Sequence, residues 1–175
     1  MKLDPEIATN SIMPEQLERL GGGTLFGSKR VPGAVELRRS HFDLIPQPLR
    51  ARVLAFDWWI ANGDRVFVDD AGNPNLLYLE ASNELVVIDH NLALDPSLMN
   101  GFWSEHAFRH DADLWAPAFC QEMADRFKNA LVHFDEIWAE LPEDWTDVDC
   151  GLTRASAESI LWRFDRESDT FWRPL

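Results

Sequence analysis

The sequence predicts an α+β fold that is mainly α-helical, and three observations support this prediction. Apolar residues recur every three or four positions over residues 118–141, which is the spacing of one face of an α-helix. A second helix is expected over residues 48–61. Two runs rich in leucine and valine, residues 75–80 and 84–88, predict a β-hairpin. Because the chain has 175 residues, 46% of them hydrophobic, it can bury one core, and we expect residues 1–175 to form a single domain.

The first predicted element is a short helix from Pro14 to Leu20. Ser11 is suited to cap its N-terminus, and three glycines that begin at Gly21 are suited to end it. Glycine and proline are dense over residues 24–33, which indicates a loop that could include one short strand.

The helix over residues 48–61 is expected to begin at Pro48, because proline fits the first turn of a helix. The Asn62-Gly63 pair that follows is a typical helix end. The two strands of the hairpin are separated by Ala81-Ser82-Asn83, which is suited to a turn.

After Pro96 the chain is predicted to be helical. The helix over residues 118–141 carries the clearest apolar stripe, and a last helix is expected from Ala155 to Phe164. The chain has eight tryptophans against one tyrosine, and such large rings favour a well-packed core. Trp58 and Trp59 are expected to pack in this core and to stiffen the loop that follows them.

Charge and cysteine usage argue against several partners and compartments. The net charge of −14 disfavours direct binding of nucleic acid or of an anionic membrane surface. No signal peptide is visible, and no run approaches the ~20 apolar residues of a membrane span. Cys120 and Cys150 lack a zinc-site spacing and fit a reducing cytoplasm, although one disulfide stays possible. His106 and His110 are expected to form a surface pair. We therefore expect a cytoplasmic protein that binds neither nucleic acid directly nor a membrane.

Three polar segments are expected to meet at one end of the hairpin. Asp64 follows the end of a helix, Asn75 opens the first strand, and Asp89 closes the second strand. A hairpin returns the end of its second strand beside the start of its first, so Asn75 and Asp89 should lie close together, with Asp64 within reach. Carboxylate and amide oxygens suit Mg²⁺, and phosphoryl transfer requires such oxygens together with a carboxylate near the nucleophile. The same residue types are also common in turns, so both interpretations remain open at this point.

These segments are similar to the C-terminal lobe signature of HipA-like kinases. The matching residues are 56–65, 72–77 and 87–94, which read FDWWIANGDR, GNPNLL and VIDHNLAL. They also resemble the related pattern of phosphatidylinositol kinases, in which N-x-D-R, N-x-N-x-L and I-D-x-x-L-A-F steps follow one another. The resemblance implies a protein-kinase-like C-terminal lobe whose small hairpin carries the metal ligands.

The resemblance also implies a role for each matching residue. Asp64 would be the catalytic aspartate, and Arg65 would support it. Asn75 and Asp89 would hold the Mg²⁺ that accompanies ATP, and His90 would support them. Asn73 is an alternative metal ligand to Asn75, because the segment offers two amides.

Some positions depart from the family pattern. Asp64 and Asn75 are 11 residues apart, which is longer than a compact kinase catalytic loop, so residues 66–71 would be an inserted loop. Leu94 stands where the family usually has phenylalanine. The upstream segment 26–34 also resembles the family. Its Gly27-Ser28-Lys29 step could cradle phosphate or form an ordinary turn, since it lacks the G-x-x-x-x-G-K-[ST] frame.

The other half of a kinase nucleotide site is not evident. The only lysines are Lys2, Lys29 and Lys128, and none lies in a strand pattern that suits a phosphate-binding lysine. About 24 residues precede the family-like region, which is too few for a five-stranded lobe. We therefore expect a C-terminal lobe without its N-terminal lobe.

Three functional hypotheses follow from these observations. The first is an ATP- and Mg²⁺-dependent Ser/Thr-kinase-like catalytic lobe that is incomplete alone, with a separate N-terminal lobe or a protein substrate as its partner. The second is a pseudokinase or interaction module that binds a partner without catalysis. The third is a structural domain without a ligand. A toxin–antitoxin setting would follow from the family name alone.

Overall fold

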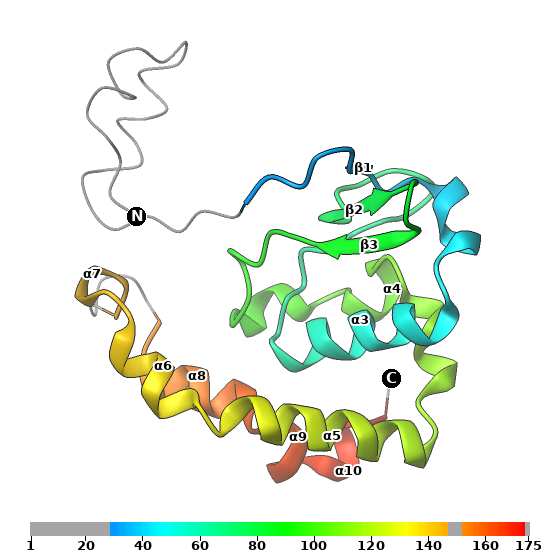
Figure 1. Cartoon of the computed structure of the whole chain (residues 1–175). Coiled ribbons are helices and arrows are strands. Elements are labelled where there is room, and N and C mark those ends of the chain that lie inside the picture. Colours follow the sequence, from blue (N-terminus) through cyan, green and yellow to red (C-terminus); the bar gives the residue numbers. More distant parts are fainter. Residues whose placement is uncertain (1–28, 147–151, 174–175) are drawn as a thin grey trace, which may run out of the picture.

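The computed structural model describes residues 29–146 and 152–173 of the chain. It has a small antiparallel sheet on one side and layers of helices on the other (Figure 1). From the start of the described residues to the last strand of the sheet, the elements are β1 (Val35–Glu36), η1 (Arg39–Leu44), α3 (Gln47–Trp59), β2 (Leu76–Leu79) and β3 (Glu84–Val87). The elements that follow are η2 (Pro96–Met99), α4 (Phe102–Glu105), η3 (Arg109–Leu114), α5 (Pro117–Leu131), α6 (Phe134–Glu140), α7 (Glu143–Thr146), α8 (Arg154–Leu161), α9 (Arg163–Arg166) and α10 (Ser168–Phe171). The prediction of a mainly helical α+β fold is confirmed.

The sheet has the strand order β1-β2-β3, with both pairs antiparallel. In the predicted hairpin Leu76 pairs with Val87 and Leu79 pairs with Glu84, so the hairpin is confirmed. Strand β1 adds a third strand just after the predicted loop, where Val35 pairs with Tyr78. Buried Leu76 and Tyr78 point from β2 into the core, because alternate residues of a strand face the same side.

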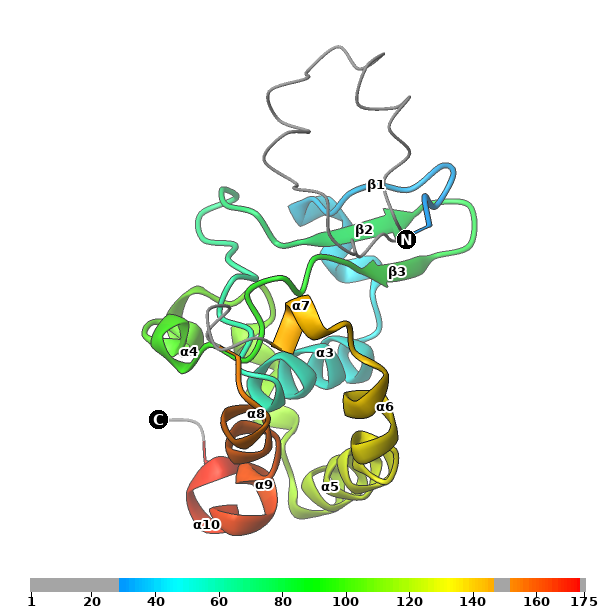
Figure 2. The same ribbon diagram turned by 90° about the vertical axis from the view of Figure 1, so that its left-hand side faces the viewer.

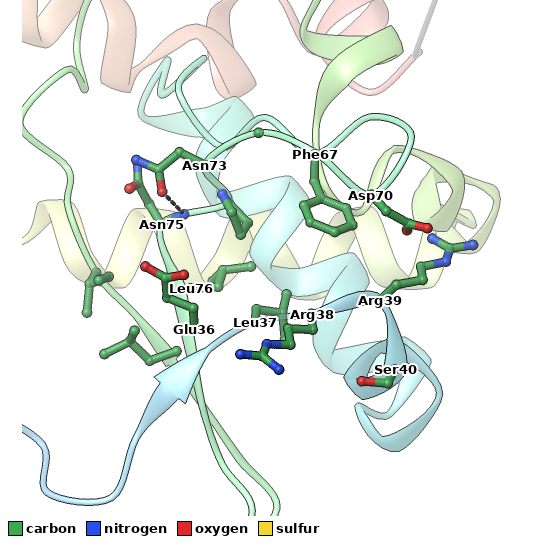
Figure 3. Close-up of a pocket in the computed structure, with 14 residues that line it drawn as sticks. Glu36, Leu37, Arg38, Arg39, Ser40, Phe67, Asp70, Asn73, Asn75 and Leu76 are labelled. Carbon is green, nitrogen blue, oxygen red and sulfur yellow. Dashed lines mark hydrogen bonds between the residues drawn. The ribbon is translucent and has the colours of Figure 1, made fainter.

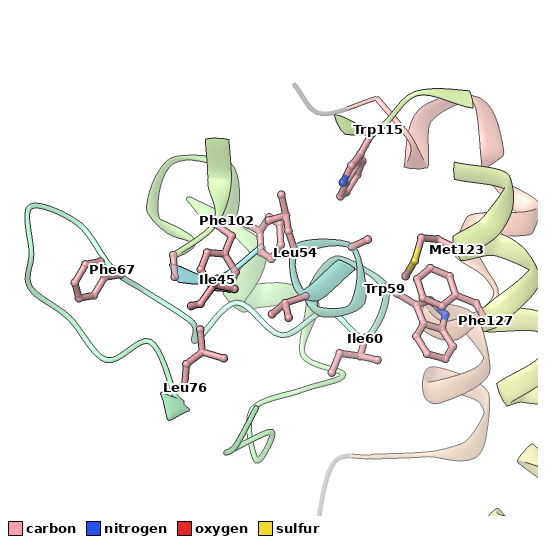
Figure 4. Packing of buried hydrophobic residues seen from close by; sticks show 14 of the residues in the cluster. Ile45, Leu54, Trp59, Ile60, Phe67, Leu76, Phe102, Trp115, Met123 and Phe127 are labelled. Carbon is pink, nitrogen blue, oxygen red and sulfur yellow. The ribbon is translucent and has the colours of Figure 1, made fainter. Parts of the chain in front are cut away.

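Helix α3 lies in the middle of the molecule, between the sheet and the layer that contains α5 and α8–α10 (Figures 1 and 2). It is buried on nearly all sides, with Leu54 and Ala55 fully enclosed. The ring of Trp59 stacks on Phe127 of α5 at 4.2 Å between centroids, as Figure 4 shows. Such stacked aromatic rings add to the stability gained from the buried area alone.

The two tryptophans that end α3 also bind the C-terminal helices through their indole N–H groups. Trp58 donates to the carbonyl oxygen of Phe171 at 2.9 Å, and Trp59 donates to that of Leu161 at 2.8 Å. The prediction that both rings pack in the core is confirmed. These contacts fix the end of α3, which is the end that leads to Asp64.

Two of the predicted helices are each broken in the structure. The helix predicted over residues 118–141 is α5 followed by α6, with a break at Val132 and His133. Val132 keeps helical torsion angles and His133 lies just outside the helical region, so the apolar spacing continues across the break and hides it. The last predicted helix, Ala155 to Phe164, is divided between α8 and α9 at Trp162. The torsion angles of Trp162, like those of His133, lie just outside the helical region.

Other predictions have different outcomes. The predicted helix from Pro14 to Leu20 lies outside the described residues, as do Gly27, Ser28 and Cys150. Cys120 is a free thiol. Within residues 29–146 and 152–173, no helix is both long and apolar enough to cross a membrane.

Candidate functional site

The loop after α3 is shaped by a left-handed residue and by contacts to a distant segment. Ala61 has a φ of 51°, which turns the chain sharply out of the helix. The N–H of Asn62 donates to the carbonyl oxygen of Asp57 at 2.8 Å, and the N–H of Leu94 donates to that of Ile60 at 2.7 Å. The end of α3, which leads to Asp64, is therefore bound to the segment that follows β3.

Asp64 and Asn75 are in direct contact. The side-chain Nδ2 of Asn75 donates to Oδ2 of Asp64 at 2.8 Å. Asn75 is buried and has a φ of 49°, while Asp64 is half-buried. Because the amide nitrogen is turned to Asp64, the amide oxygen of Asn75 stays available to a ligand. The structure thus brings together two of the residues that the sequence singled out.

Asp89 lies at the neighbouring end of β3. The N–H of Ile88 donates to the carbonyl oxygen of Asn75 at 3.1 Å, which places the two strand ends side by side. Asp89 itself is exposed, with a φ of 54°, and it makes no hydrogen bond or ion pair with any of the described residues. Its carboxylate is therefore available to a ligand.

Asn73 lies beside Asn75 but has a different place in the site. Its Oδ1 accepts a hydrogen bond from the backbone N–H of Asn75 at 3.2 Å, which is shown as a dashed line in Figure 3. This contact closes a local turn, and the Asn73 side chain is otherwise exposed. Asn73 therefore has a turn-forming role in the structure that Asn75 does not have.

Arg65 is fully buried and joins the three segments of the site. Its guanidinium forms a two-pronged ion pair with Asp57 of α3, with Nε–Oδ2 at 2.6 Å and Nη2–Oδ1 at 3.0 Å. Its Nη1 also donates to backbone carbonyl oxygens at the start of β2 and the end of β3. These acceptors are Pro74 at 3.0 Å, Asn75 at 2.6 Å and Ile88 at 3.4 Å. Because it is enclosed, Arg65 cannot touch a substrate, and it acts by holding its neighbours in place.

Two residues of this buried network, Asp57 and His106, were not predicted from the sequence to belong to the site. Asp57 accepts from Arg65, from the side chain of Asn62 at 2.9 Å, and from His106 Nε2 at 3.0 Å. Nδ1 of His106 accepts from the backbone N–H of Phe108 at 3.0 Å, so the ring proton lies on Nε2. We call Asp57, Arg65 and His106 the buried charge cluster.

The buried charge cluster has defined protonation states. Burial alone would raise the pKa of Asp57, but hydrogen bonds from His106 and Arg65 outweigh it and hold the pKa below its usual value. Burial lowers the pKa of His106 and outweighs the attraction of Asp57, so His106 is neutral. The prediction that His106 pairs with His110 at the surface is wrong, because His106 is buried while His110 is exposed. The signal for Asp57 was an acidic residue within the apolar period of a helix, but His106 lies 49 positions away and gave no such signal.

His90 links the buried charge cluster to the surface. Its Nε2 lies 3.3 Å from Nη2 of Arg65, and since a guanidinium can only donate, Nε2 must be the acceptor. Burial and the positive charge of Arg65 both lower the pKa of His90, which is consistent with a neutral ring. The remaining ring N–H of His90 is then Nδ1.

The inserted loop between Asp64 and Asn75 is anchored rather than loose. Phe67 is buried in the core, and its N–H donates to the carbonyl oxygen of Glu105 at 2.9 Å. The loop closes at Gly72, whose φ is 117° and where an added Cβ would lie 2.5 Å from the carbonyl oxygen of Val66. The loop thereby delivers Asn75 to Asp64 despite the long spacing in sequence.

Two open hollows lie at the ends of β2 and β3. One has a volume of about 930 Å³ and is lined by Lys29, Arg30, Val31, Ala34, Leu77, Val87, Ile88, Asp89, His90 and Asn91. The other, of about 770 Å³, lies between η1 and the inserted loop, and Asn73, Asn75, Arg38, Arg39 and Asp70 are among its lining residues (Figure 3). Asp89 and Asn75 thus each border a space that a ligand could enter.

The oxygen atoms of this site fit a hard cation better than a transition metal. The amide oxygen of Asn75 and the carboxylate of Asp89 are ligand types that Mg²⁺ prefers. Over the part of the chain that the structure describes, no group of three or more His, Cys, Asp or Glu residues could hold a metal ion. Mg²⁺ commonly takes few protein ligands and fills its shell with water or phosphate oxygens.

Comparison with known proteins gives one match. A family model described as HipA-like kinase matches residues 1–175. No curated protein and no solved structure matches the chain. The family match covers the full sequence, including every residue of the site described above.

Proposed function

The chain belongs to the HipA-like kinase family, and from this premise we propose that it is an ATP- and Mg²⁺-dependent phosphotransferase lobe with Asp64, Asn75 and Asp89 at its centre. The observation that carries the proposal is the 2.8 Å hydrogen bond between Asn75 and Asp64, together with the free carboxylate of Asp89 at the neighbouring strand end. Asn75 and Asp89 each border an open hollow, which leaves room for a ligand at both strand ends.

In this proposal Asp64 handles the proton of the acceptor. Its Oδ2 is bound to Asn75, which fixes the carboxylate and leaves Oδ1 to accept a hydrogen bond from an acceptor hydroxyl. The hydroxyl oxygen forms a bond to the terminal phosphorus of ATP while the bond from that phosphorus to the bridging oxygen of ADP breaks. The hydroxyl proton passes to Asp64, and ADP leaves.

Asn75 and Asp89 would hold the metal ion. A bound Mg²⁺ would neutralise charge on the phosphate oxygens and orient the phosphates for transfer. Arg65 binds the carbonyl oxygens of Asn75 and Ile88 and so holds the two strand ends in position. His90 contacts Arg65 and lines the same hollow as Asp89. Arg65 and His90 therefore support the site, and Asn73 shapes the turn that leads to Asn75.

The acceptor we propose is a serine or threonine hydroxyl of a protein partner. The three-stranded sheet of the described residues carries no lysine, so a lysine contact to the phosphates of the kind made by an N-terminal kinase lobe would come from elsewhere. We propose that a β-rich lobe, on another chain or in another segment, completes the nucleotide site.

Isothermal titration calorimetry with MgATP tests this function directly. We expect the wild-type chain to bind MgATP and Asp89→Asn to lose at least tenfold in affinity, because the metal loses a charged ligand. Asp64→Asn should keep the affinity within about threefold. With the completing lobe added, it should abolish the phosphoryl transfer to protein that the wild type shows, measured with ATP labelled at the terminal phosphate. The matched control is Asp169→Asn, an exposed residue of α10, which should change neither measurement.

Two results would change the proposal. Wild-type chain that binds no MgATP at millimolar concentrations would contradict a working site on this lobe. MgATP binding that depends on Asp89, but with no transfer from the wild type even when candidate lobes are added, would favour the pseudokinase hypothesis.

A further inference from the structure

Two cations line the hollow beside Asp89, and the described residues do not neutralise them. Lys29 and Arg30 are both exposed and both line this hollow of about 930 Å³. Neither forms an ion pair within residues 29–146 or 152–173. In a chain of net charge −14, two adjacent unpaired cations at a hollow offer a local site for an anion.

The same hollow is also lined by the end of β3 and the residues after it. It presents the exposed carboxylate of Asp89 and the half-buried ring of His90. Leu77, Val87 and Ile88 add an apolar wall. A single ligand that fits all three surfaces must carry several negative charges, bind a metal ion and include an apolar group.

A nucleoside triphosphate has this combination of features. We propose that Lys29 and Arg30 bind its phosphate chain in the hollow while its metal ion lies on Asp89, an inference that rests on the proposed function. Lysine supplies a compact positive charge, and the planar arginine fork can bind two phosphate oxygens at once. Lys29, which the sequence placed in a loop, thus gains a specific ligand. The segment before β1 then adds positive charge for the phosphates to that of the lysine in the completing lobe.

The two sets of charges in the hollow should have opposite effects on the binding of a phosphate chain without metal. Lys29 and Arg30 attract such a chain, whereas the Asp89 carboxylate repels it. When a metal ion accompanies the phosphates, Asp89 becomes attractive and the cations stay attractive. Comparing the two ligands therefore separates the role of the cations from the role of the metal ligand.

Calorimetry with two probes, tripolyphosphate without divalent metal and MgATP, tests the inference on the full chain. We expect the double variant Lys29→Ala, Arg30→Ala to bind both probes about tenfold more weakly than the wild type. Its affinity for both probes should also depend less on the salt concentration. Asp89→Asn should bind tripolyphosphate a few-fold more tightly but MgATP at least tenfold more weakly. The matched control is Arg52→Ala, Arg126→Ala, which removes the same charge from exposed positions on α3 and α5 and should change either affinity by less than about twofold.

Each outcome bears on a different claim. If MgATP binding depends on Asp89 but not on Lys29 and Arg30, the inference fails and the proposed function stands. If tripolyphosphate binding depends on the two cations while Asp89→Asn leaves MgATP binding unchanged, the cationic site stands and the metal role of Asp89 fails. Equal losses in the cation variant and in the matched control would show a general charge effect and overturn the inference.

Discussion

The buried charge cluster and the hollow beside Asp89 are neighbouring sets of charged residues in opposite situations. In the cluster, Asp57, Arg65 and His106 are completely enclosed, and each is bound to the others or to backbone groups. In the hollow, Lys29, Arg30 and Asp89 are exposed and have no ion-pair partner among the described residues. Arg65 and His90 connect the two regions through one 3.3 Å contact.

The difference separates charges that maintain the structure from charges that can meet a ligand. Removing one partner from a buried ion pair leaves an uncompensated charge in a poorly polar environment, which is costly. Removing an exposed, unpaired charge leaves nothing uncompensated. Substitutions in the cluster should therefore act on stability first, and substitutions in the hollow should act on binding alone.

The largest effect is expected for Asp57→Asn, which keeps the shape of the side chain but removes its charge. Arg65 would remain buried without its ion-pair partner, and we expect a loss of about 3–5 kcal/mol in the free energy of unfolding. Urea denaturation measures this loss. Glu122→Gln is the matched control, because its ion pairs to Arg52 and Arg126 are exposed and should contribute under about 1 kcal/mol. A loss of similar size in both variants would remove the distinction between the two regions.

A second, smaller effect is expected from pH. The pKa of His106 is lowered in the folded state by burial, whereas in the unfolded chain it has its ordinary value of 6.5. The unfolded chain therefore takes up a proton first as the pH falls, so the His106 contribution is fully present above 6.5 and is lost between 6.5 and the lowered folded value. One such group gives a slope of at most about 1.4 kcal/mol per pH unit.

His106→Gln should reduce the slope of unfolding free energy against pH, measured by urea denaturation between pH 7.5 and pH 5. The wild type should retain the steeper slope, to which His90 contributes with the same sign because its pKa is also lowered. The control is the same substitution at the exposed His133, which tests the effect of replacing a histidine at the surface. An identical slope in the wild type and His106→Gln would contradict a neutral His106 in the folded chain.

The smallest effect on stability is expected for Asp89→Asn. Asp89 is exposed and has a φ of 54°, a left-handed conformation that asparagine also tolerates. The unfolding free energy should therefore change by no more than about 0.5 kcal/mol, although MgATP affinity should fall. Thermal and urea denaturation check the first part. A large loss of stability would show that Asp89, like Asp57, maintains the fold.

Local patterns were sufficient for several parts of the fold and for the placement of three site residues. The helix period over residues 48–61 and the two apolar runs of the hairpin identified α3, β2 and β3, because these elements bury side chains with a regular spacing. Hairpin geometry then placed Asn75 beside the end of β3, where Asp89 lies. The roles of Asp64, Asn75 and Asp89 in catalysis and metal binding remain predictions.

What the sequence did not show depends on contacts between distant residues. His106 meets Asp57 across 49 positions, and no local pattern predicts a partner at that distance. Strand β1 is only two residues long, and its residues pair with Tyr78 and Leu77, which lie far along the chain. The break between α5 and α6 leaves the apolar spacing intact, so periodicity alone could not reveal it.

The grip of Arg65 on three backbone carbonyl oxygens also has a consequence for how the chain folds. Arg65 can bind Asn75 and Ile88 only after the hairpin has formed, and its charge can be buried only after Asp57 and His106 have come together. The contact of Arg65 with Ile88 joins residues 23 positions apart, and that of Asp57 with His106 joins residues 49 positions apart. The loops that these two contacts close must lose their freedom before the contacts can stabilise them. In a nascent or partly folded chain, Asp64, Asn75 and Asp89 would not yet be held in their positions. The site that we propose would therefore form only when folding is complete.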